Sequence, residues 1–304
     1  MKLSALGMAV AFMVGPAVAV ADDLEDAIQN LKDAAAKKDA ALVKKLAESI
    51  YPMTCEILAE TAPKDADEKK IWDERIAYAK GAEAYVESAL AGTALQSPPA
   101  VMVDLISTLE QENPKSKYLD EAYGPYLVAL NKTGSGAKIP AIAEKALAHF
   151  PENEDLLLLM TDTAMSRKQT DRALNYANRL TAVLSRHPKP EGVAAADWER
   201  KKSASLAHGY YVAGVISAEK GGYVAADKNL RAALPLIQGQ PAMLGPALFY
   251  LGMANYQLGK MTMNKAKLLD AVKFSEQSMV LDSPYAEQAR HNALVIKQEA
   301  ARMR

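Results

Sequence analysis

The chain is poor in cysteine and in aromatic residues. Cys55 is the only cysteine among 304 residues, and aromatic residues make up 6% of the sequence. A single thiol excludes an intrachain disulfide, and we expect it to be buried and inert. Segments rich in Val, Ile and Thr with the alternation typical of strands are also absent. Helix packing must therefore stabilise the fold, and the abundance of Ala, Leu, Lys and Glu predicts an all-α protein.

The chain also lacks an excess of charge of either sign. Its 36 basic and 37 acidic residues leave a formal net charge of −1. This balance produces no field that would attract nucleic acid or an anionic membrane, so we expect neither as a partner. Basic pairs such as Lys201-Lys202 stand among acidic residues and are typical of solvated helix faces.

Motifs of catalysis and of metal binding are missing as well. The four histidines show no metal-ligand spacing, and the sequence contains no His-Glu-x-x-His pattern and no EF-hand loop. The segment from Gly134 to Lys138 resembles the start of a phosphate loop, but it lacks the rest of that pattern and follows a predicted helix rather than a strand. We therefore expect no metal, no cofactor and no enzyme activity.

The first feature that is present is an export signal. Lys2 precedes an apolar run, Leu3 to Val14, and Ala19-Val20-Ala21 forms an A-x-A cleavage site. We predict a signal peptide over residues 1–21, cleavage after Ala21, and a periplasmic or secreted protein. The run is short for a spanning helix, so no stable membrane span is expected after cleavage.

Residues 22–96 are predicted to form an N-terminal helical segment without a repeat signature. Apolar residues recur there at helical spacing, and one long helix is expected over residues 67–95. Ser97 and Pro98 are predicted to cap and open the following helix. The boundary to a repeat domain over residues 97–304 is placed at this point.

The stretch from Ala213 to Ala233 has the pattern of two helices that pack closely around a tight turn. Gly214 on the first helix and Ala226 and Ala233 on the second lack bulk where helices would cross. Gly221-Gly222 breaks the chain between them, and Tyr223 follows. This stretch resembles a tetratricopeptide repeat, which carries small residues, a turn glycine and an aromatic residue at these positions.

Related units precede and follow this stretch. In the last unit, Gly252 is assigned to the position of Gly214, and Gly259 to the turn. The resemblance covers residues 114 to 303. It implies a right-handed α-solenoid of about four antiparallel helix hairpins, closed by a C-terminal capping helix.

The resemblance also implies a concave groove lined by the first helix of each unit. Carried over position by position, the predicted groove residues are His208, Tyr211, Val215, Glu219, Phe249, Met253, Tyr256 and Gln257. In the preceding unit the same positions include Asp155 and Asp162. Tyrosine and methionine beside a few polar groups suit an adaptable peptide site, although a first helix also has a core face.

The expected function is that of a non-catalytic scaffold of the bacterial cell envelope, which binds a partner protein or peptide in this groove. Two alternatives remain open. A hydrolase acting on the cell wall could use groove carboxylates such as Asp162 and Glu219. A structural envelope protein could self-assemble through its terminal helices, which leaves homo-oligomerisation open.

Overall fold

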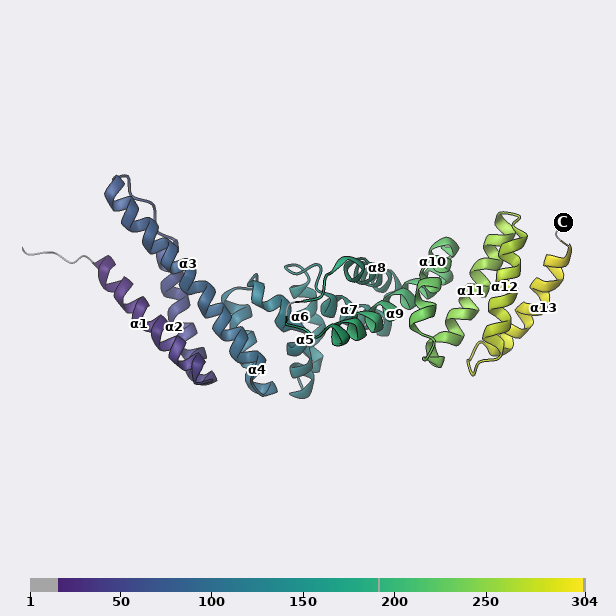
Figure 1. The fold of residues 1–304 in the computed structure, drawn as a ribbon, viewed down its shortest axis with the longest axis horizontal. Helices are drawn as coiled ribbons and strands as arrows, with labels where there is room; N and C mark the ends of the chain where they lie inside the picture. The colour runs from purple at the N-terminus through teal and green to yellow at the C-terminus, as the bar shows by residue number, and fades with distance from the viewer. Residues whose placement is uncertain (1–15, 191, 303–304) are drawn as a thin grey trace, which may run out of the picture. The chain divides into compact units, whose positions relative to one another are not determined.

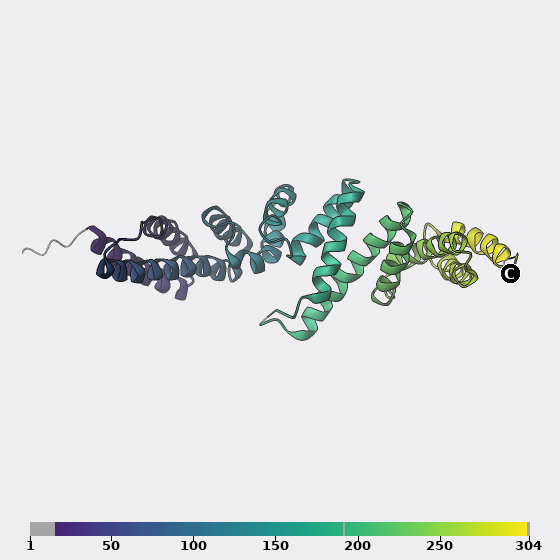
Figure 2. The same ribbon diagram turned by 90° about the horizontal axis from the view of Figure 1, so that it is seen from above.

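The computed structural model describes residues 16–190 and 192–302. In these ranges the chain forms thirteen α-helices and two short 3-10 helices, and no strand (Figure 1). The all-α prediction is confirmed. Most of the helices pack against their neighbours in sequence, as Figures 1 and 2 show within each part of the chain. Among the described residues, none of the helices is both long and apolar enough to cross a membrane.

The helices divide into two compact units, and the boundary along the chain falls between Ile139 and Pro140. We call them unit 1 and unit 2. The limits predicted from the sequence, 22–96 and 97–304, follow the start of the repeat pattern rather than compactness, and they stay a prediction. The apolar run of the predicted signal lies outside the described residues, and the predicted cleavage site lies in the first helix.

Unit 1 is a two-layered stack of five helices. Each helix packs against the next, and α1 also contacts α3, α2 contacts α4, and α3 contacts α5. A 3-10 turn at Gly136–Lys138 follows the last helix. The helices are α1 (Pro16–Ala36), α2 (Ala40–Leu58), α3 (Ala66–Leu95), α4 (Pro99–Glu112) and α5 (Lys117–Lys132).

Unit 2 continues the same manner of packing. Helices α7, α9, α11 and α13 contact one another in succession, and we call them the first row. The intervening helices pack chiefly against their neighbours in sequence. The unit begins in α6 (Ile139–Ala146) and contains α7 (Glu154–Ser166), α8 (Thr170–Arg186), α9 (Ala195–Glu219), α10 (Tyr223–Ala233), the 3-10 turn Leu234–Leu236, α11 (Pro241–Met261), α12 (Lys265–Met279) and α13 (Ala286–Arg302).

Five turns between helices of the described chain share one backbone conformation. A single residue adopts positive φ in each, and the N–H of the next residue donates to a carbonyl five residues back, as in a Schellman motif. The α1–α2 turn has this form too, although the sequence shows no repeat signature there. The residues with positive φ are Lys38, Gly134, Lys168, Gly221 and Met263.

The turn predicted at Gly259 is wrong. Gly259 lies inside α11, where a Cβ atom would come 2.6 Å from Cδ2 of Leu268 on the next helix. The chain turns at Met263, whose φ is 51°, and the Asn264 side chain accepts the N–H of Lys267 as the cap of α12. The first helix of this unit, α11, therefore extends past the predicted turn to Met261.

Two further predictions are corrected by the structure. Cys55 is exposed on α2 rather than buried, because the apolar stripe of this helix runs along Val43, Ala47 and Ile50. Ser97 does not cap α4: its hydroxyl donates to the Thr93 carbonyl at 2.7 Å and so belongs to the end of α3. The long helix expected over residues 67–95 is confirmed to within one residue.

The predicted close crossing of α9 and α10 is present. A Cβ atom at Gly214 would lie 2.5 Å from Cγ of Leu230, and Ala226 and Ala233 are fully buried. Atoms at such a separation overlap, so the two helices approach this closely only because position 214 has no side chain.

We expect Gly214→Ala to lower the local free energy of unfolding of α9 and α10 by about 2 kcal/mol, because the methyl group overpacks Leu230. Gly81→Ala in α3 is the matched control, since its Cβ atom would meet nothing within 4 Å. That change should raise the stability of α3 by about 0.5 to 1 kcal/mol. Hydrogen exchange of the corresponding peptides measures both effects, and equal effects of the two changes would contradict the assigned crossing.

Candidate functional site

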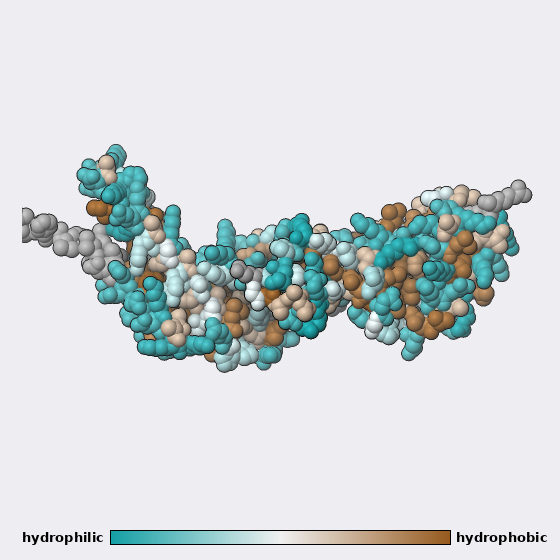
Figure 3. Space-filling view, viewed as in Figure 1, coloured by the Kyte–Doolittle hydropathy of each residue, from teal (hydrophilic) through white to brown (hydrophobic). Residues whose placement is uncertain are grey.

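Aromatic side chains from three elements of unit 2 gather beside the first row. Tyr211 lies on α9, Phe249 and Tyr250 lie on α11, and Tyr285 directly precedes α13. We call these four residues, together with Glu219 at the end of α9, the aromatic face. Hydrophobic residues are also prominent over α10 to α12 on the side of unit 2 that Figure 3 shows.

The rings of the aromatic face pack in defined geometries. Phe249 and Tyr285 are stacked, with ring centroids 4.5 Å apart and an interplanar angle of 15°. Tyr250 meets both rings edge-on, at centroid distances of 5.3 and 5.5 Å. Phe249 is only 5% exposed, whereas Tyr211 and Tyr285 are half-buried. Tyr250 is also buried, at 7% exposure, so Phe249 and Tyr250 form the floor of the face, and Tyr211 and Tyr285 form its accessible part.

The hydroxyl groups of Tyr250 and Tyr285 are connected by hydrogen bonds to the carboxylate of Glu219. The Tyr250 hydroxyl donates to Oε1 of Glu219 at 2.7 Å, and the Tyr285 hydroxyl lies 3.3 Å from that of Tyr250. Burial, followed by the hydrogen bonds to Tyr285 and Glu219, raises the pKa of Tyr250 far above its ordinary value. Burial also raises the pKa of Tyr211, with smaller effects of Tyr285 and Glu219. The face thus combines neutral phenols with one exposed carboxylate.

Five of the eight predicted groove residues come together here. Tyr211, Val215, Phe249 and Met253 belong to or pack against one hydrophobic cluster. Glu219 joins them through Tyr250.

The other three predicted groove residues lie elsewhere on the first row. His208 contacts Asp162 of α7, with 2.6 Å between Nε2 and Oδ1. Tyr256 packs against a separate cluster near α12 and α13, and its hydroxyl donates to Glu299 at 3.0 Å. Gln257 is half-buried on α11.

Tyr250 and Tyr285 were not predicted from the sequence. Tyr250 lies 13 residues before Met263 (263 − 250), as His208 lies 13 before Gly221 (221 − 208), so it would have been selected if the turn had been placed correctly. Tyr285 lies between α12 and the C-terminal helix, outside the predicted groove positions, and its role depends on stacking with Phe249.

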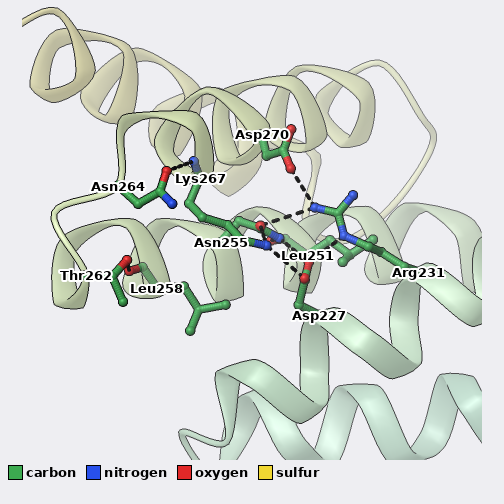
Figure 4. Close-up of polar contacts among 9 residues, drawn as sticks. All are labelled: Asp227, Arg231, Leu251, Asn255, Leu258, Thr262, Asn264, Lys267 and Asp270. Atoms are coloured by element: carbon green, nitrogen blue, oxygen red, sulfur yellow. Dashed lines mark hydrogen bonds and ion pairs between the residues drawn. The ribbon is translucent and has the colours of Figure 1, made fainter.

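A second polar arrangement joins α10, α11 and α12 (Figure 4). Asn255 is fully buried and donates to Oδ1 of Asp227 at 2.6 Å, while Lys267 donates to Oδ2 at 3.0 Å. Arg231 bridges Asp227 to Asp270. Burial would raise the pKa of Asp227, but the hydrogen bonds from Asn255, Lys267 and Arg231 outweigh it and lower the pKa. Because its donors and acceptors are matched, this network holds three helices together.

Unit 1 contains a carboxyl group of a different kind, Glu112 at the end of α4. Both of its oxygens are shielded from solvent, and the described residues provide them with no hydrogen-bond partner. Burial, reinforced by Glu48 and Glu87, raises its pKa to about 7. The negative end of the α4 dipole also disfavours its charge. The sequence analysis did not single out Glu112, although an acidic residue at a helix end that is followed by Asn113-Pro114 is visible in the sequence.

No cluster of three or more His, Cys, Asp or Glu residues that could hold a metal ion occurs in the described ranges. Glu112 itself, with a pKa raised to about 7, can exchange a proton near neutral pH.

We expect the pH dependence of the stability of unit 1 to reflect Glu112. Its folded pKa lies above the ordinary value of 4.5, so the unfolded chain releases the proton first, and stability falls as pH rises from about 4.5 through about 7. Glu112→Gln should remove this loss and gain about 2 kcal/mol over the parent chain at pH 8, but little at pH 4.

Urea unfolding at the two pH values, followed by hydrogen exchange of α4 peptides, measures the effect. Glu121→Gln on the exposed side of α5 is the control and should give the profile of the parent chain. A Glu112→Gln gain that is equal at pH 4 and pH 8 would contradict the assignment, because a titration effect must vanish where both states are protonated.

Comparison with known proteins gives no further assignment: no protein-family model matches the chain, and no curated protein matches it.

Proposed function

We propose that the chain is a non-catalytic scaffold of the bacterial cell envelope that binds a partner polypeptide on the aromatic face of unit 2. The proposal depends on three tyrosines that come together from separate elements beside one exposed carboxylate: Tyr211 and Tyr285 are half-buried, and Tyr250 is buried beneath them. Tyrosine is enriched where proteins bind one another, because it offers a large apolar ring and a hydroxyl at little cost in conformational entropy.

The tetratricopeptide form of the fold belongs to this proposal. The turns at Gly134 and Lys168 lie 34 residues apart (168 − 134), which is the period of that repeat. The crossing of Gly214 with Leu230 supports the same form, since it places a small residue where the two helices of a unit meet. In such repeats the first helices line the binding groove, and the aromatic face lies on first-row helices.

A polypeptide suits this surface better than a small substrate. The face extends over two helices and the start of a third, and Met253 and Val215 border it with side chains that adapt to an apolar partner. A hydrolase would need its two carboxylates close together, but in the described residues Asp162 lies beside His208 and Glu219 accepts the Tyr250 hydroxyl, with no contact between the two. Envelope localisation rests on the predicted signal peptide.

A photo-crosslinking phenylalanine derivative in place of Tyr211 tests the proposal. The full chain carrying it is irradiated in envelope extract and analysed by mass spectrometry. We expect one dominant polypeptide adduct, because an aromatic probe at this position retains the ring and faces the partner. The control places the same probe at Lys273, an exposed residue of α12, where that adduct should be missing.

Equal adducts at both positions would indicate non-specific contact and contradict the proposal. Adducts only between copies of this chain would favour the self-assembling alternative instead.

A further inference from the structure

Glu219 differs from the other acidic residues predicted for the groove. Asp155 on α7 is neutralised by Lys201, with 2.9 Å between the charged atoms, and Asp162 contacts His208 at 2.6 Å. Glu219 is exposed, and in the described part of the chain it forms no ion pair with any Lys, Arg or His. The aromatic face therefore carries a negative charge that the protein itself leaves without a cation.

The surroundings of this carboxylate favour a cation. The Tyr250 hydroxyl donates to Oε1 of Glu219, and no described residue donates to its Oε2. Tyr211 and Tyr285 are partly exposed, and the faces of their rings carry partial negative charge that attracts cations. A cation at this place would gain both an ion pair with a hydrogen bond and contact with aromatic rings.

The chain contains an internal example of this arrangement. Tyr256 donates to Glu299 as Tyr250 donates to Glu219, and there Lys260 supplies the cation. Nζ of Lys260 lies 3.8 Å from the Glu299 carboxylate and 5.1 Å from the centre of the Tyr256 ring. The protein therefore supplies a cation, Lys260, to the pair of Tyr256 and Glu299, whereas no described residue supplies a cation to the pair of Tyr250 and Glu219.

We propose that Glu219 and the half-buried Tyr211 and Tyr285 of the aromatic face bind the guanidinium group of an arginine side chain in the partner polypeptide. This inference rests on the proposed function and names the chemistry that the partner must present. Arginine fits better than lysine because its planar group stacks on aromatic rings while its N–H groups reach a carboxylate. An ammonium group is a compact charge that holds its water more strongly.

The test uses the full chain and three small probes: N-acetyl-argininamide, N-acetyl-lysinamide and N-acetyl-citrullinamide. Citrulline has nearly the shape of arginine but no charge. Tyrosine ring signals are followed by NMR and assigned with Tyr→Phe variants. We expect saturable shifts of Tyr211 and Tyr285 with the arginine probe, several-fold weaker binding of the lysine probe, and no shifts with the citrulline probe.

Two matched variants distinguish binding at Glu219 from general electrostatic attraction of a cation to the protein. Glu219→Gln keeps the shape of the side chain and should weaken binding of the arginine probe by about tenfold. Glu299→Gln removes a charge from the equivalent pair, which already has Lys260, and should leave the affinity unchanged. Because Glu219 is exposed, the variant is expected to fold, and circular dichroism verifies this.

Three results would overturn the inference: shifts of equal size with the citrulline probe, lysine binding as tight as arginine binding, or equal weakening by both variants. The crosslinking experiment repeated with Glu219→Gln distinguishes this inference from the function on which it rests. A partner adduct of unchanged yield would reject arginine recognition while the binding function stands. Failure of the parent chain to form the adduct would reject the function itself.

Discussion

The close approach of α9 to α10 at Gly214 is the contact on which the rest of unit 2 depends. Leu230 occupies the space that a side chain at position 214 would need, so the two helices form one tightly packed hairpin. Gly252 and Gly259 allow the same approach between α11 and α12, where added Cβ atoms would come 2.6 Å from Ser275 and Leu268. With each hairpin held in this way, α9 and α11 also contact each other, and their aromatic residues meet.

Polar interactions then fix what apolar packing leaves adjustable. Apolar side chains alone would allow neighbouring helices to shift along each other. The buried Asn255 donates to Asp227 of α10 and accepts from Lys267 of α12, and both hydrogen bonds form in only one relative position of the three helices. On the aromatic face, stacking of Tyr285 on Phe249 ties the start of α13 to α11. The residues of the aromatic face are therefore held in place by packing between three elements. Side chains that are already ordered lose less conformational entropy when a partner binds.

Periodicity predicts the helices well, because each must bury an apolar stripe, and the limits of α3 follow from sequence to within one residue. The site was predicted in part. Tyr211 and Glu219 were found because Gly221 marks their turn locally, whereas Tyr250 was missed because a methionine, not a glycine, adopts positive φ at the next turn. The place of Tyr285 and the exposure of Cys55 depend on tertiary packing, which no local pattern encodes.

Oxidative footprinting of the full chain, alone and in envelope extract, tests most directly whether the aromatic face is occupied by a partner. The account predicts that Tyr211, Tyr285 and Met253 become protected in the extract. Met263, which is 75% exposed at the α11–α12 turn, should be oxidised equally in both conditions. Unchanged oxidation of the face, or protection of Met263 to the same extent, would contradict a binding surface at this place.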